Sequence, residues 1–173
     1  ISPVKIAYLP QNVRFEDEEL TVLETFKKDV VMTPTEARST LAKFLFYGEQ
    51  VFKKVKGLSG GEKSRLLLCK LLQEEVNLLI LDEPTNHMDL HVRETLESVL
   101  ENYEGTLLLI THDRYMMERI CDHLLVFKGQ TIKRFEGTLK EYEERQQKPV
   151  VKKELEKQKL EMEHRLTYLL GQL

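Results

Sequence analysis

Two apolar runs separated by one amphipathic segment constrain the fold of this chain most strongly. Val76–Leu81 and Thr106–Thr111 are apolar without regular polar alternation, which is typical of strands covered on both faces. Between them, Leu90–Tyr103 repeats its apolar residues at helical spacing. Two strands joined by a helix make a β-α-β unit, and such units form parallel sheets. The sequence therefore predicts an α/β fold built on a parallel sheet.

Shorter patterns on both sides extend this unit. Periodicity and turn residues predict further strands at Val4–Leu9, His123–Phe127 and Thr131–Phe135, and further helices at Leu20–Lys28, Pro34–Tyr47, Ser59–Gln73, Asp113–Cys121 and Leu139–Gln147. We expect Gly48 to end the helix that starts near Pro34. Ser59 and Glu62 have the spacing of a capping box, so Ser59 should be the N-cap of its helix.

A change in composition at Pro149 predicts a domain boundary. Residues 1–148 should form one domain with a helical subdomain over about residues 20–73, and residues 149–173 a charged amphipathic helical tail. The tail's apolar stripe, which includes Val151 and Leu155, suits a solvated helix that packs on its own domain. It equally suits a coiled-coil arm for a partner, and the stripe is too short to decide between them.

Charge and composition exclude several classes of protein. The chain has 173 residues, with 26 basic and 29 acidic side chains, for a net charge of -3. This balance excludes a surface that is basic throughout. No apolar run approaches the roughly 18 residues of a membrane span, and no signal-peptide pattern opens the chain. Cys69 and Cys121 lack metal-site spacing, so we expect two buried, reduced thiols in a soluble cytoplasmic protein without a membrane partner.

Two adjacent acids, Asp82 and Glu83, follow the first apolar strand. In nucleotide hydrolases the first acid in such a position holds Mg²⁺ at the β- and γ-phosphates, and the second polarises the attacking water. Strands often end in polar loops, however, so the pair taken alone is more often an ordinary strand end.

The segment Ser59-Gly60-Gly61-Glu62 stands at a predicted helix start. Its glycines expose backbone N–H groups, and the helix dipole favours an anion there, which suits a nucleotide phosphate. The alternative is an ordinary glycine-containing loop with an N-cap.

His112 ends the second apolar strand. If the two strands are neighbours, this side chain lies beside Asp82 and Glu83 and can bind a γ-phosphate or hold the attacking water. A histidine at a strand end is otherwise a surface residue without special function.

The order of these motifs resembles the ATP-binding-cassette family from about Val4 to Gln147. The matching residues are Gln11 as the Q-loop glutamine, Ser59–Glu62 as the signature loop, Asp82 and Glu83 as the Walker B pair, Asp89 as the D-loop aspartate and His112 as the switch histidine. The wording of Glu83–Asp89 (EPTNHMD) is similar to the ABC-F branch, which is soluble and carries two cassettes in one chain. Met88 stands where that branch usually has leucine.

The resemblance implies ATP and Mg²⁺ as cofactors and a P-loop NTPase sheet with an inserted helical subdomain and a C-terminal helix. It implies catalytic roles for Glu83 and His112, nucleotide contacts from Gln11, Ser59, Gly60, Gly61, Glu62 and Asp89, and Mg²⁺ ligation by Asp82 and Gln11. Ser59, Gly60 and Gly61 are expected to contact ATP held by the other cassette of the same parent chain. ABC-F proteins act on the ribosome and its rRNA during translation, and some confer antibiotic resistance. The alternative is the nucleotide-binding subunit of a membrane transporter.

One family motif has no match in the 173 residues, namely the Walker A loop GxxxxGK(S/T). The segment Gly57–Ser64 comes nearest to it, but it has Glu62 where the second glycine should be, and a carboxylate would repel phosphates. We therefore expect the C-terminal part of one cassette, the second of two judging from the tail. As an isolated polypeptide it is expected to lack ATPase activity and to self-associate.

Overall fold

The computed structural model describes residues 3–86, 88–147 and 157–162. The chain divides into two compact units, Ile1–Ile120 and Cys121–Leu173. Within the predicted tail, residues 157–162 are helical. The predicted boundary at Pro149 and most of the tail lie outside the described residues, so the two interpretations of the tail remain predictions.

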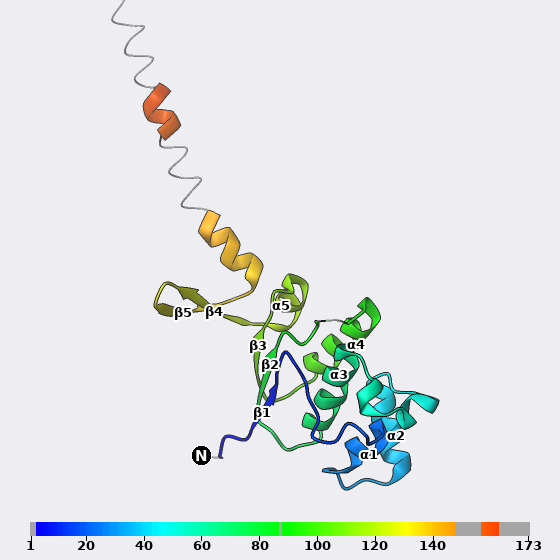
Figure 1. Cartoon of the computed structure of the whole chain (residues 1–173). Coiled ribbons are helices and arrows are strands. Elements are labelled where there is room, and N and C mark those ends of the chain that lie inside the picture. Colours follow the sequence, from blue (N-terminus) through cyan, green and yellow to red (C-terminus); the bar gives the residue numbers. More distant parts are fainter. Residues whose placement is uncertain (1–2, 87, 148–156, 163–173) are drawn as a thin grey trace, which may run out of the picture. The chain divides into compact units, whose positions relative to one another are not determined.

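The first unit is built on a three-stranded parallel sheet (Figure 1). Its strands are β1 (Ile6–Leu9), β2 (Leu78–Asp82) and β3 (Thr106–Ile110), in the order β1-β2-β3. Leu9 pairs with Leu81, and Leu81 pairs with Leu109. The β-α-β unit predicted from the two apolar runs is therefore confirmed, and β1 adds a third parallel strand.

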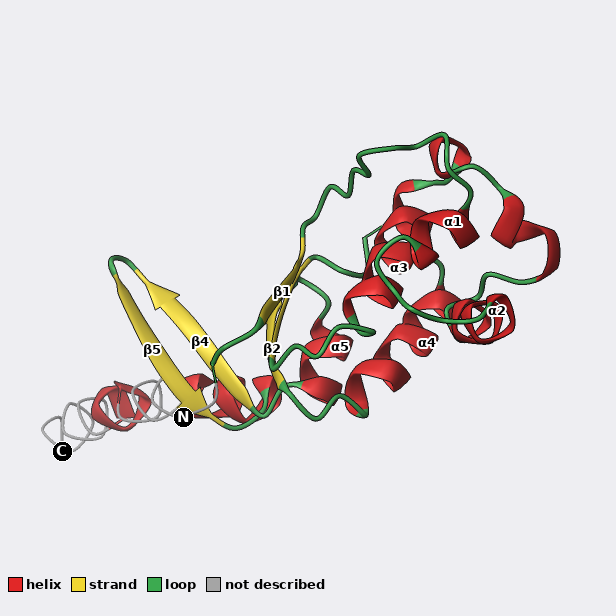
Figure 2. Cartoon of the chain, turned by 90° about the horizontal axis from the view of Figure 1, so that it is seen from below, coloured by secondary structure: helices red, strands yellow, loops and turns green. Residues whose placement is uncertain are grey.

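The two faces of this sheet differ in burial, which corrects one prediction. Leu79 and Leu81 of β2 are fully buried on one face. On the other face Tyr8 is 50% exposed and Ile110 is 49% exposed. The prediction that both apolar strands are covered on both faces is wrong for β3, which alternates between exposed and half-buried residues. The physical reason is that α3 and α4 lie on the same side of the sheet (Figure 2), and the described residues of this unit leave the other side open.

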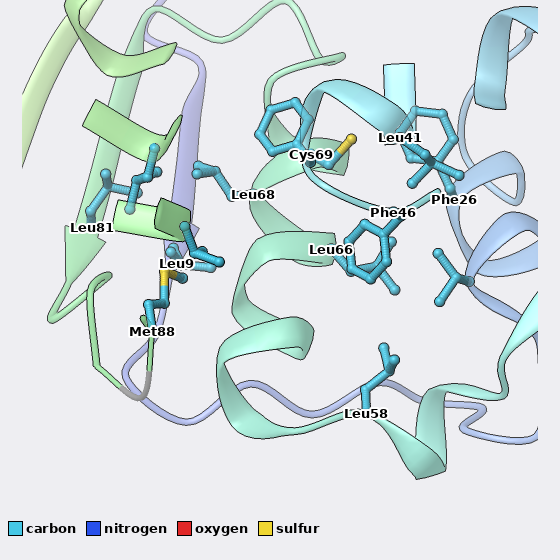
Figure 3. Packing of buried hydrophobic residues seen from close by; sticks show 14 of the residues in the cluster. Leu9, Phe26, Leu41, Phe46, Leu58, Leu66, Leu68, Cys69, Leu81 and Met88 are labelled. Carbon is cyan, nitrogen blue, oxygen red and sulfur yellow. The ribbon is translucent and has the colours of Figure 1, made fainter. Parts of the chain in front are cut away.

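Helices and short 3-10 turns make up the rest of the first unit. They are α1 (Val22–Lys27), α2 (Pro34–Lys43), η1 (Gly48–Phe52), η2 (Val55–Gly57), α3 (Gly60–Leu71), α4 (Leu90–Glu101) and α5 (Arg114–Ile120). Helix α3 is central: Leu68 faces Leu9 and Leu81 of the sheet, whereas Leu66 lies toward Phe46 on the other side (Figure 3). These side chains belong to one continuous core cluster. The sheet and the helical segment thus share a single core, because α3 is apolar on two sides.

Helix α2 ends earlier than predicted and without a glycine. Its last helical residue is Lys43, and Leu45 rather than Gly48 takes the left-handed conformation at the end of the helix, with φ 61°. The Phe46 N–H donates to the Leu41 carbonyl at 3.0 Å, which is the bond of a Schellman motif. Leu41 and Phe46 are both buried. Packing of these two residues therefore holds a leucine where the local preference is for glycine.

The second unit contains a β-hairpin and a helix. Strands β4 (His123–Lys128) and β5 (Thr131–Glu136) pair antiparallel in a separate two-stranded sheet. A helix covers residues 139–147. The Phe135 and Tyr142 rings meet edge to face at 5.3 Å between centroids, so the helix packs on the hairpin.

Both cysteines are free thiols, but only one is buried as predicted. Cys69 lies in the core of the first unit, and burial raises the pKa of its thiol. Cys121 is only half-buried, because it lies in the connection between α5 and β4. Within the part of the chain that the structure describes, no helix is long and apolar enough to cross a membrane.

Candidate functional site

The carboxyl ends of the parallel strands gather four of the predicted site residues at one edge of the sheet. Asp82 ends β2, Glu83 follows it, His112 follows β3 and Gln11 follows β1. The Glu83 N–H donates to the Ile110 carbonyl at 2.7 Å, which continues the ladder between β2 and β3 past the end of β2. The carboxyl edge of an α/β sheet is where ligands usually bind.

The Glu83 carboxylate lies between two groups from the end of β3. Its Oε1 atom is 3.5 Å from Nε2 of His112, and its Oε2 atom accepts from the Thr111 hydroxyl at 3.4 Å. The Glu83 side chain is 13% exposed, whereas the His112 side chain is fully exposed. Both distances are long for hydrogen bonds, so the two groups position the carboxylate but leave it able to accept further hydrogen bonds. It can accept a proton from a small molecule that enters the edge, and His112 can turn toward an anion.

Glu83 also has an unusual backbone that the sequence did not predict. Its φ is 49°, in the left-handed region that residues other than glycine rarely adopt. Its carbonyl accepts the Asn86 N–H at 3.1 Å, so Glu83 starts a tight turn. Pro84 and Thr85 in this turn are buried. A glutamate before a proline gives no local signal for a positive φ, so this feature could not have been found from sequence.

Asp82 is the candidate metal ligand. Its Oδ2 atom accepts one long hydrogen bond, from the Tyr8 hydroxyl at 3.4 Å. A carboxylate can accept about four hydrogen bonds, so Asp82 retains capacity for a cation. Among the described residues, no group of three or more His, Cys, Asp or Glu residues could hold a metal ion unaided. Mg²⁺ is usually held by one or two carboxylates together with phosphate oxygens, and a single carboxylate here fits that donor set.

A second group of predicted residues lies at the start of α3. Ser59 is the N-cap, and its hydroxyl accepts the Glu62 N–H at 3.2 Å. Glu62 Oε2 accepts the Ser59 N–H at 2.6 Å, and Glu62 Oε1 lies 3.4 Å from Lys53 Nζ. Partial burial would raise the pKa of Glu62, but the hydrogen bonds from Ser59 and the charge of Lys53 outweigh it and lower the pKa. The predicted capping box is confirmed, and its carboxylate is ionised.

Gly60 and Gly61 are the first two residues of α3, and neither has a positive φ. The helix itself therefore does not require glycine at either position. A glycine inside a helix costs about 1 kcal/mol relative to alanine. What the two glycines provide is a backbone without side chains at a helix start, where N–H groups remain open to an anion.

Two clefts beside α3 bring the remaining residues together. The first cleft, of about 410 Å³, is lined by residues that include Tyr47, Ser59, Gly61, Glu62, Arg65 and Asp89. The second, of about 530 Å³, is lined by residues that include Gln11, Gly60, Lys63 and Asn86. Asp89 is the N-cap of α4, and its Oδ1 atom accepts the Val92 N–H at 3.0 Å. None of the residues that line the first cleft is Asp82, Glu83 or His112. Asp82, Glu83 and His112 thus lie at the sheet edge and Ser59, Gly61, Glu62 and Asp89 at the first cleft, whereas Gln11 and Gly60 share the second cleft.

Tyr47 and Arg65 are among the residues of the first cleft that sequence reasoning missed. The Arg65 guanidinium lies over the Phe46 ring, 4.7 Å from its centroid. Burial lowers the pKa of Arg65, while Glu62 and Asp89 act in the opposite direction. Neither residue belongs to a short motif, so only the folded chain reveals that they share a cleft with the α3 start.

Known proteins resemble this chain in sequence. The family described as ABC transporter matches residues 1–86. The chain is 43% identical over 149 residues to the putative ATP-binding protein YdiF of Bacillus subtilis, covering 83% of this chain and 23% of that protein. It is 37% identical over 131 residues to the ATP-binding protein Uup of Escherichia coli, covering 73% of this chain and 21% of that protein. The chain thus spans less than a quarter of the length of these relatives.

Solved structures resemble the chain in fold. A dimeric ATP-binding cassette in a post-hydrolysis state, bound to ADP and phosphate, matches with a TM-score of 0.59 and 20% identity. The match covers 77% of this chain and 63% of that chain. A metal-chelate type ABC transporter in an inward-facing conformation matches with a TM-score of 0.55 and 20% identity, over 76% of this chain and 58% of that chain. At this level of identity the likeness concerns the fold.

Proposed function

Because this chain belongs to the ATP-binding-cassette family, in its ABC-F branch, we propose that it is part of an ATPase that hydrolyses ATP between paired cassettes. The single observation that carries the proposal is the position of the Glu83 carboxylate beside His112, directly after Asp82 at the carboxyl edge of the sheet. A carboxylate with open acceptor capacity next to a candidate metal ligand is the arrangement that phosphoryl transfer to water requires.

The chemistry follows from the residues of the sheet edge. Asp82 and Gln11 would hold Mg²⁺, which would supply positive charge to the phosphates. Glu83 accepts a proton from the attacking water through the carboxylate oxygens that His112 and Thr111 position. The water oxygen bonds to the γ-phosphorus, the bond from this phosphorus to the bridging oxygen breaks, and ADP and phosphate leave. The exposed His112 ring donates a hydrogen bond to the γ-phosphate.

The α3 group acts on a second nucleotide, which the opposing cassette holds. Ser59, Gly60 and Gly61 present a hydroxyl and open N–H groups to its phosphates, and the α3 dipole points its positive end there. Glu62 and Asp89 line the same cleft and border this nucleotide beside its phosphates. In this assignment the sheet edge and the start of α3 each serve a different nucleotide.

The biological setting rests on family resemblance alone. In that setting the protein acts in the cytoplasm on the ribosome and its rRNA, in translation or in antibiotic resistance. No residue described above carries this part of the proposal. Co-sedimentation of the two-cassette protein with ribosomes, with and without ATP, tests it separately, and equal recovery without ribosomes contradicts it.

The ATPase proposal is tested in the two-cassette protein that contains this chain. Glu83→Gln keeps the size of the side chain but removes the base, so turnover should fall at least about a hundredfold while ATP binding persists. Glu94→Gln is the matched control, because Glu94 is an exposed acid on α4 that lines neither cleft. Turnover of Glu83→Gln at the rate of the control would overturn the assignment of the base.

Gly61→Asp tests the second group. It places a side chain and a negative charge at the buried second residue of α3, where a phosphate of the opposing nucleotide must come close. We expect hydrolysis at the opposing cassette to stop while initial ATP binding there is nearly intact. Single-turnover assays with each Walker A lysine disabled in turn resolve the two nucleotides. Unchanged turnover at the opposing cassette would mean that Ser59–Glu62 is only a capped helix start.

A further inference from the structure

The first cleft combines two kinds of lining that a phosphate alone does not need. Ser59 and Gly61 bring the polar start of α3 to it. Leu45, Met88 and Val92 also line it and give it an apolar part. Ligand sites typically join an apolar wall with a few placed polar groups, and the volume of about 410 Å³ lies in the usual range for small molecules. The cleft is therefore built for a ligand that has an anionic part and a flat or apolar part.

Tyr47 is the one Phe, Tyr or Trp residue among those that line this cleft, and hydrogen bonds hold its backbone. It directly follows Phe46, which is 1% exposed, whereas Tyr47 itself is 54% exposed. The Tyr47 N–H donates to Gln50 Oε1 at 3.1 Å, and its carbonyl accepts the Gln50 N–H at 2.9 Å. An exposed ring on a backbone held in this way is preorganised to pack against a planar ligand.

The charges of the cleft favour different places for the anionic part and the neutral part of such a ligand. Glu62 and Asp89 place two carboxylates in it, which disfavour phosphates near their side chains, and Arg65 adds one guanidinium, which lies over the Phe46 ring. The open N–H groups at the start of α3 are the favourable place for phosphates. Sugar hydroxyls and a base are neutral, and a hydroxyl can donate to a carboxylate. The nucleoside thus suits the rest of the cleft.

We propose that Tyr47 contacts the nucleoside of the nucleotide whose phosphates face Ser59 and Gly61. This inference rests on the proposed function, because that nucleotide is the one held by the opposing cassette. Tyr47 then sets specificity: it distinguishes a nucleotide from a bare triphosphate at the α3 surface.

The test compares Tyr47→Ser with Phe52→Ser in the two-cassette protein. Phe52 lies at the end of η1, is 50% exposed and is not among the residues that line the cleft, so it is a matched loss of an exposed ring. The KM for ATP should rise about three- to tenfold in Tyr47→Ser, as expected for one aromatic contact, and stay unchanged in Phe52→Ser. Tyr47→Phe should restore the wild-type KM.

Inorganic tripolyphosphate serves as a probe without a nucleoside. Its inhibition constant against ATP hydrolysis should be the same in Tyr47→Ser and wild type. An equal rise for ATP and tripolyphosphate, or an equal effect of Phe52→Ser, would overturn the proposal, because either result means general damage to the α3 surface. An unchanged KM for ATP in Tyr47→Ser would also overturn it. In that case a Glu83→Gln variant that has lost turnover still supports the ATPase assignment. A wild-type protein without ATP turnover would overturn the proposed function itself.

Discussion

The capping box at the start of α3 allows a direct test of how this candidate phosphate surface is held. In Glu62→Gln the new amide oxygen can still accept the Ser59 N–H, which the carboxylate now accepts at 2.6 Å. The charge is lost, and with it the ion pair to Lys53 at 3.4 Å. The substitution therefore removes the electrostatic part of the cap and leaves its shape.

The expected loss at neutral pH is modest and can be worked out from these contacts. A complete side-chain cap contributes about 1 kcal/mol, and a charged acceptor makes its hydrogen bond roughly twice as strong as a neutral one. The pair with Lys53 adds only a few tenths of a kcal/mol at most, because the Lys53 side chain is 44% exposed and solvent screens it. Glu62→Gln should thus lower the free energy of unfolding by about 0.5–1 kcal/mol, and Glu62→Ala by about 1–2 kcal/mol.

The contribution of Glu62 to stability depends on pH, and the direction of this dependence follows from the shift of its pKa. The folded chain lowers the pKa of Glu62, despite a burial effect in the opposite direction, because Ser59 and Lys53 favour the ionised form. A lowered pKa means that the contribution is complete above the ordinary glutamate pKa of about 4.3 and is lost as the pH falls through the folded value. The difference between wild type and Glu62→Gln should therefore shrink below a pH of about 4.

Urea unfolding of the 173-residue chain, followed by helical circular dichroism between pH 3 and pH 7, measures this difference. Glu94→Gln, an exposed acid on α4, is the control and should track the wild type at every pH. If the unfolding free energies of wild type and Glu62→Gln ran parallel down to pH 3, the charge of Glu62 would not hold the start of α3, and the reasoning would fail.

Two further predictions concern the 173-residue chain as a whole. Without a Walker A loop among its residues it should bind Mg-ATP too weakly to saturate at micromolar concentrations, and titration calorimetry that finds micromolar binding would contradict this. The open sheet face, with Ile6, Tyr8, Leu108 and Ile110, should cause self-association, which light scattering would detect and Leu108→Lys should reduce. A well-behaved wild-type monomer at high concentration would refute the second prediction.

Much of the fold could be predicted because its signals are local. The apolar runs and the helix between them specified the parallel arrangement of β2 and β3. Burial of the second face of the sheet could not be predicted. An apolar run shows that a strand can be buried on both faces, but it does not show that other segments pack against them. Whether Leu108 and Ile110 are covered depends on which segments pack there, and in the described residues of the first unit none do so fully.

Some residues of the candidate site could likewise be predicted from sequence, and others could not. Residue types and order placed Asp82, Glu83 and His112 together, since consecutive parallel strands bring their carboxyl ends to one edge. Tyr47 and Arg65 were missed because their relation to α3 depends on the path of the chain after α2. That path turns at Leu45 with a positive φ, which is stabilised by tertiary packing rather than by any local preference.

Several residues depart from the backbone conformation or helix propensity that is usual for their type, and these departures bear on the site independently of family resemblance. The positive φ of Leu45 is offset by the burial of Leu41 and Phe46, so packing explains it. The positive φ of Glu83 starts a turn in which Pro84 and Thr85 are buried, so packing accompanies this departure as well, while the Glu83 carboxylate itself lies beside His112 at the sheet edge. Gly60 and Gly61 weaken the start of α3 although their backbone does not need glycine. Local costs that packing does not offset tend to mark functional positions. Here such a cost falls at the start of α3, one of the two groups that the proposed mechanism uses.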